Sequence, residues 1–172
     1  MKLSKRVKSA EYNRIRDFIE LLISVHPFGF GILLGKYRPP TSIEVHEMMN
    51  SQRDPLPVDY RATQKSSTTE AERIYQDSEY FSQTVDLAGG WEHINHIARE
   101  FLKIDKRMWD VSVDHVKYVA NPSSRYFSRL EYVANKHGIS RNTVVKYRKL
   151  FPCVLSMMLL TPDGEKFEIT GE

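Results

Sequence analysis

The stretch of sequence that decides the fold is residues 125–151, RYFSRLEYVANKHGISRNTVVKYRKLF. Apolar residues recur at spacings of three and four on both sides of Gly138, which predicts two helices over 126–137 and 140–150. Glycine tolerates the positive φ that a tight turn between two helices requires. Ser140 follows at the place where the second helix needs an N-terminal cap. The stretch therefore predicts two helices that cross at a short turn.

The inner faces of these two expected helices are apolar. Ala134 is small enough for the second helix to pack against it, and Val144 follows ten residues later as the inward residue of that helix. Ile139 comes directly after the turn glycine, and its side chain is expected to pack into the core and so anchor the turn. These choices agree with one another, which carries more weight than any single match. The expected motif core is Leu130, Val133, Ala134, Gly138, Ile139, Val144 and Tyr147.

This arrangement resembles the helix-turn-helix DNA-binding motif, with a supporting helix over 126–137 and a recognition helix over 140–150. It departs from the usual pattern at Tyr147, where an aliphatic residue is commoner, and at His137, which is often apolar. More loosely, the C-terminal part resembles phage-encoded or phage-like transcription regulators related to sigma-factor region 4. The resemblance implies that the second helix enters the major groove of double-stranded DNA.

The outward face of the expected recognition helix carries the residues that would meet DNA. Arginine can bond two atoms of guanine and asparagine two atoms of adenine, so Arg141 and Asn142 are the first candidates for reading bases. Val145 and Lys146 point outward as well and complete the base-reading set. The candidates for contacts with phosphate are Arg125, Arg129, Ser140, Thr143, Arg148 and Lys149.

The positive charge of the chain is concentrated in this motif. The 172 residues include 25 lysines and arginines and 22 acidic residues, which gives a net charge of only +3. Residues 125–149 hold seven basic residues and one acidic residue, so the motif carries +6 and the rest of the chain −3. A localised positive patch is the electrostatic footprint of a nucleic-acid-binding surface. The alternative is a basic helix face that is simply solvated.

Two interpretations fit the end of the chain. Pro152 is expected to end the second helix. Residues 153–170 contain a Thr-Pro-Asp-Gly turn at 161–164 and fit a β-hairpin, which would resemble the wing of winged-helix proteins. The apolar run at 154–160 is equally compatible with a short buried helix or an oligomerisation surface.

The remainder of the chain is expected to be helical as well. Apolar spacing and capping-box patterns predict helices over 9–25, 41–50, 69–81, 91–102 and 110–119. Residues 26–40 mix glycines with aromatic and aliphatic residues and fit a strand, a packed loop or a small docking surface.

A domain boundary is expected in the polar, proline-containing stretch 51–67, which lacks periodicity and is predicted to be a linker or a functional loop. It would separate a helical N-terminal region (1–50), with a role in dimerisation or partner contacts, from a helical DNA-binding domain (68–172).

Composition excludes several classes of protein. A single cysteine, Cys153, rules out an internal disulfide and a cysteine-rich zinc site. The longest apolar runs fall well short of the roughly 20 residues that span a bilayer, and the charged N-terminus lacks a secretory apolar stretch. We therefore expect a cytoplasmic, nucleoid-associated protein without a membrane partner.

Two weaker clusters concern metal binding. His93 and His96 are three residues apart on an expected helix, but no spacing supplies two further ligands. The acidic set Asp105, Asp110 and Asp114 would suit Mg²⁺ in a nuclease, yet the basic residues among them favour a solvated face. No phosphate loop, dinucleotide fingerprint or nucleophile elbow occurs. We expect no metal, no cofactor and no enzymatic activity.

These observations predict a mainly α protein with a C-terminal helix-turn-helix, an optional wing and a helical N-terminal region. The expected function is sequence-specific DNA binding in transcriptional regulation, as a homodimer whose two recognition helices reach successive turns of the major groove. The N-terminal half would contact RNA polymerase or another protein. The alternatives are a DNA-docking factor in replication, partition or packaging and, less favoured, a nuclease or recombinase.

Overall fold

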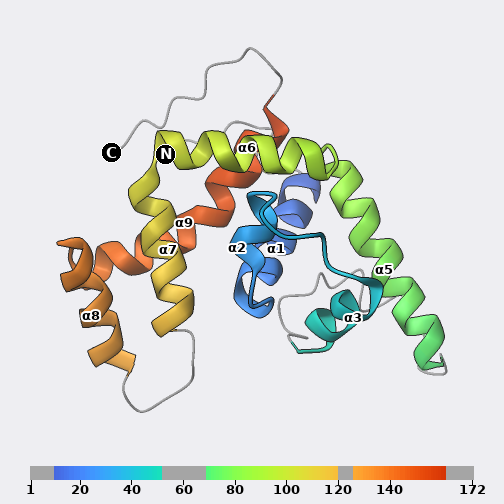
Figure 1. The fold of residues 1–172 in the computed structure, drawn as a ribbon, viewed down its shortest axis with the longest axis horizontal. Helices are drawn as coiled ribbons and strands as arrows, with labels where there is room; N and C mark the ends of the chain where they lie inside the picture. The colour runs from blue at the N-terminus through green and yellow to red at the C-terminus, as the bar shows by residue number, and fades with distance from the viewer. Residues whose placement is uncertain (1–9, 52–68, 120–125, 162–172) are drawn as a thin grey trace.

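The computed structural model describes residues 10–51, 69–119 and 126–161, and the secondary structure in these ranges is entirely helical. The prediction of a mainly α fold is therefore confirmed. The helices, in chain order, are α1 (Ala10–Val25), α2 (Gly29–Leu33), α3 (Ser42–Ser51), α5 (Glu70–Leu87), α6 (Trp91–Ile104), α7 (Lys106–Tyr118), α8 (Tyr126–His137) and α9 (Arg141–Leu160). In Figure 1, α1 and α2 lie in the middle, α8 lies at one end and α3 and the start of α5 lie at the other.

Side-chain caps account for where several helices begin. The hydroxyl of Thr41 accepts a hydrogen bond from the backbone N–H of Glu44 at 3.3 Å, as the capping pattern predicts. Thr69 accepts in the same way from Glu72 at 3.3 Å and starts α5. Helix α7 begins earlier than its apolar spacing indicated, because the carboxylate of Asp105 caps it.

Within the glycine-containing stretch 26–40, residues 29–33 form the short helix α2 and the rest is turn and loop, so the alternative of a strand is wrong. A Cβ atom on Gly29 would lie 2.2 Å from the carbonyl oxygen of Leu22. Only glycine allows α2 to lie this close to the backbone of α1. Helix α2 is therefore packed directly on α1.

The main hydrophobic core takes side chains from α1, α2, α3, α5, α6, α7 and α9. Phe151 lies at its centre and is fully buried. The ring packs edge-on against Phe30, Phe101 and Trp109, with centroids 5.2–5.4 Å apart. Edge-to-face pairs add to the free energy of burial, so the aromatic cluster joins the N-terminal and C-terminal parts of the chain.

Residues 10–51 do not pack as a separate unit. Helix α3 packs on α5 and α1 packs on α9, so the N-terminal helices contribute to the same core as the C-terminal ones. Of the predicted linker at 51–67, residues 52–67 lie outside the described residues. A dimerisation or partner surface in the N-terminal part would therefore belong to the same folded body as α8 and α9.

Helix α9 does not end at Pro152, which corrects the sequence expectation. The helix runs through this proline to Leu160. An interior proline removes one backbone hydrogen bond and costs about 3 kcal/mol. The side chains of Phe151 and Leu155 are fully buried, and the burial of each contributes about 1.5–3 kcal/mol. Burial on both sides of Pro152 therefore outweighs the cost of the proline.

The continuation of α9 also overturns the first strand of the predicted wing. Residues 153–160 are helical and mostly buried, as in the alternative of a buried helix. The second half of the hairpin, residues 162–170, lies outside the described residues.

Candidate nucleic-acid interface

Helices α7, α8 and α9 form a small three-helix unit with a hydrophobic core of its own. The buried members are Val111, Val119, Leu130, Val133, Ala134 and Val144. Ile139 and Tyr147 are partly buried against them. All the apolar side chains expected in the motif core thus lie at this junction.

The turn between α8 and α9 has the geometry that its glycine indicated. Gly138 has φ +62°, and its N–H donates to the carbonyl of Asn135 at 3.2 Å. The N–H of Ile139 donates to the carbonyl of Ala134 at 3.0 Å. These two bonds form a Schellman motif, which ends α8 and redirects the chain. The hydroxyl of Ser140 then accepts from the N–H of Thr143 at 3.2 Å and starts α9.

Polar contacts from α7 hold the C-terminal end of α8. Arg107 donates to the carbonyl of His137 at 2.9 Å, which satisfies a backbone group that the end of the helix leaves free. The carboxylate of Asp114 bonds to Nε2 of His137 at 2.6 Å and pairs with Lys136 at 3.0 Å. His137, a departure from the usual pattern, is thus explained by a partner on α7.

The N-terminal half of α9 presents an exposed polar surface. Arg141, Asn142, Lys146 and Lys149 are all exposed on this helix. Ser140 is exposed at the start of the helix, whereas Thr143 is partly buried. Val145 is also partly buried and packs against the small core, so only part of its side chain is accessible to a DNA base. The structure therefore brings together the strongest of the candidate DNA-contacting side chains.

The candidates on α8 are less complete. Arg129 lies on α8 and is partly exposed. Arg125 lies outside the described residues.

Arg148 does not belong to this surface, which corrects the expectation of a phosphate contact. Its guanidinium donates to both carboxylate oxygens of Glu20 on α1 at 2.8 Å and to the hydroxyl of Ser24 at 2.8 Å. Only 11 % of the Arg148 side chain is exposed. The reason is helical spacing: Val144, Arg148 and Phe151 share the inward stripe of α9.

The ion pair between α1 and α9 was missed by sequence reasoning. Glu20 and Arg148 are 128 residues apart, and a two-pronged arginine–carboxylate pair is a specific geometry. The sequence contained one signal for this pair: Arg148 falls on the inward stripe of its helix, where a charged residue needs a partner. The signal was overlooked because the whole segment is basic. The pair fixes one side of α9 to the helical body.

His115 lies beside this ion pair in an unusual environment. Its Nδ1 atom is buried and has no hydrogen-bond partner in the described part of the chain. Burial, followed by the positive charge of Arg148, lowers the pKa of His115 from 6.5 to about 4. The imidazole is therefore neutral at neutral pH.

The remaining sequence candidates are the histidines and aspartates considered as metal ligands. Within the described ranges, no three His, Cys, Asp or Glu side chains come together in a way that could hold a metal ion. Nε2 of His93 faces the backbone carbonyl of Leu159 at 3.4 Å. No helix in those ranges is long and apolar enough to cross a membrane.

Comparison with known proteins does not identify this chain. No protein-family model matches it, and neither a curated protein nor a solved structure shows significant similarity to it. Its function must be inferred from the geometry of the three-helix unit.

The positive φ of Gly138 yields a first prediction. Alanine in the left-handed region costs about 1–2 kcal/mol, whereas asparagine adopts it more readily. Gly138→Ala should therefore lower the free energy of unfolding by about that amount, and Gly138→Asn by clearly less. Urea denaturation followed by circular dichroism measures both. Equal losses for the two variants would contradict a left-handed residue at this turn.

The low pKa of His115 predicts a pH-dependent stability. The unfolded chain takes up a proton near pH 6.5 and the folded chain only near pH 4, so His115 lowers stability as the pH falls from about 6.5 towards 4. His115→Gln should reduce the loss of stability between pH 7 and pH 4.5, measured as the change in urea midpoint. The exposed His96→Gln serves as the control and should keep the parental dependence. An unchanged pH dependence in His115→Gln would refute the assignment.

Proposed function

We propose that this chain is a sequence-specific DNA-binding regulator of transcription that uses α8 and α9 as a helix-turn-helix. One observation carries the proposal: a glycine turn supported by a three-helix core presents the exposed, basic start of α9 to solvent. Side chains that hydrogen-bond to bases need a rigid support, and the turn and the core provide it.

The proposed contacts follow from the placement of each side chain. Arg141 and Asn142 lie in the first turn of α9, the part of a recognition helix that reaches base edges. Lys146 lies one turn further along and extends this surface. Lys149, Ser140 and Thr143 are suited to phosphate oxygens, and the positive end of the helix dipole favours such contacts at Ser140.

The proposal includes a homodimer and a protein partner. Two copies of a recognition helix bind half-sites about one helical turn of DNA apart. RNA polymerase or another regulator would contact a surface away from α8 and α9, such as the opposite end formed by α3 and α5 (Figure 1).

A DNA-docking factor in replication, partition or packaging is the second candidate. The same exposed basic surface favours it, because phosphate contacts alone give binding without sequence preference. Selection of bound DNA from a random pool separates the two functions. One enriched, palindromic site supports the homodimeric regulator, whereas unselective and strongly salt-dependent binding supports docking.

Replacement of Arg141 tests the base-reading surface. Arg141→Ala should weaken binding to the selected site by about 1–3 kcal/mol and relax the preference at one base pair. Fluorescence anisotropy on the parental site and on its single-base variants measures both effects. Lys103→Ala, an exposed change on α6, is the matched charge control and should leave the affinity unchanged. Parental affinity and base preference in Arg141→Ala would show that α9 does not read DNA.

Two adjacent basic residues of α9 should behave differently. Lys149 is exposed, so Lys149→Ala should reduce the dependence of the logarithm of affinity on the logarithm of salt concentration by about one unit, with parental stability. Arg148 is buried against Glu20, so Arg148→Met should lower the thermal unfolding temperature. Its salt dependence should stay parental. A shallower salt dependence in Arg148→Met would contradict its burial.

A further inference from the structure

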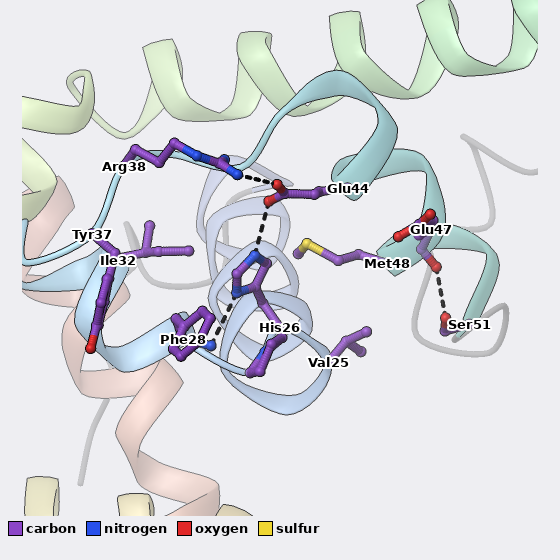
Figure 2. A pocket seen from close by; sticks show the side chains of 11 residues that line it. Val25, His26, Phe28, Ile32, Tyr37, Arg38, Glu44, Glu47, Met48 and Ser51 are labelled. Atoms are coloured by element: carbon purple, nitrogen blue, oxygen red, sulfur yellow. Dashed lines mark hydrogen bonds and ion pairs between the residues drawn. The ribbon is translucent and has the colours of Figure 1, made fainter.

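A cavity of about 530 Å³ opens between the C-terminal end of α1, the turn that follows it, α2 and α3 (Figure 2). This volume lies within the range of small-molecule binding sites. Val25, Ile32 and Met48 give the cavity an apolar wall. The cavity is separate from the exposed surface of α9, and the inference drawn from it does not rest on DNA binding.

One side of the cavity is held by a network of charged and polar groups. The carboxylate of Glu44 accepts hydrogen bonds from Arg38 at 2.5 Å and from Nε2 of His26 at 3.1 Å. Nδ1 of His26 accepts the N–H of Phe28 at 3.1 Å, which assigns the ring proton to Nε2. Figure 2 shows these three side chains joined by hydrogen bonds. The charges of Arg38 and Glu44 balance each other, and His26 adds none in this arrangement.

Two aromatic rings form a second side of the cavity. Phe28 and Tyr37 lie with their ring centroids 4.9 Å apart, and each is 52 % exposed. A Cβ atom on Gly31 would lie 2.3 Å from the ring of Tyr37, so the ring rests directly on the glycine backbone. The absence of a side chain at Gly31 therefore makes room for a half-exposed ring that is packed in place.

Glu47 supplies a further negative charge to the lining of the cavity. It lines the cavity from α3, is exposed, and makes no ion pair with any residue that the structure describes. With Arg38 and Glu44 balanced, the lining residues that the structure describes carry one net negative charge. An anionic ligand would meet this charge without compensation, whereas a cation would be attracted by it.

We propose that this cavity binds a small organic cation with an apolar body. Aromatic faces attract a quaternary or protonated amine, and a nearby carboxylate adds to the attraction. The apolar wall buries the body of the ligand, and removal of apolar surface from water supplies most of the binding free energy. In this proposal the rings and the apolar wall contact the body of the ligand, and Glu47 attracts its positive charge.

Two probes of the same shape test the charge preference. Phenyltrimethylammonium is the cation, and tert-butylbenzene is its uncharged counterpart. Protein labelled with ¹³C at the methionine methyl groups reports binding through the Met48 signal, which Met48→Leu identifies by its loss. We expect a saturable shift with the cation at an affinity at least tenfold higher than with the uncharged probe. Equal affinities, or no shift at Met48 with either probe, would overturn the proposal.

Substitutions in the cavity test the two roles separately. Glu47→Gln should weaken the cation at least threefold and leave tert-butylbenzene unchanged. Tyr37→Leu should weaken both probes. The control is Glu79→Gln, an exposed change on α5 that should bind as the parent does. Glu47 is exposed, so Glu47→Gln should unfold at the parental temperature. Parental affinity for the cation in folded Glu47→Gln would refute the role of this carboxylate.

Discussion

The burial of the C-terminal half of α9 fixes the position of its N-terminal half. Phe151 packs among three other aromatic rings at the centre of the main core, and α9 runs without interruption from this point back to Arg141. A continuous helix transmits a position along its length, because its backbone hydrogen bonds leave little freedom to bend. Two features therefore hold the exposed N-terminal end of α9 in place. One is the turn at Gly138, and the other is the packing of Phe151, more than two helical turns further along.

The ion pair between Arg148 and Glu20 acts at the middle of the same helix. It lies between the main core and the small three-helix core, and it joins α9 to α1 through a geometry that few side chains satisfy. Water reaches Glu20, so the net contribution of the pair to stability is small. Removal of Glu20, however, would leave the charge of Arg148 buried without a partner. The pair thereby selects one rotation of α9, the rotation in which Lys149 remains exposed.

The turn at Gly138 depends on α7 as well as on its own residues. Arg107 and Asp114 bond to the last residues of α8, so three helices define the geometry rather than two. His137 is polar where the usual pattern often has an apolar residue. The unit stays packed because the carboxylate of Asp114 bonds to this histidine. Arg107 and Asp114 lie outside residues 126–150, so the sequence of the two-helix motif alone does not reveal that α7 supports the turn.

The local features of the chain followed from its sequence. Most of the helices (α2 is the exception), the Gly138 turn and the caps at Thr41, Thr69 and Ser140 depend on residues only a few positions apart, and the same holds for the exposure of Arg141 and Asn142. The tertiary structure alone decided that α9 passes through Pro152, that Arg148 turns inward and that residues 10–51 share the main core. These outcomes depend on burial and on partners more than 100 residues away, and neither periodicity nor composition records such contacts.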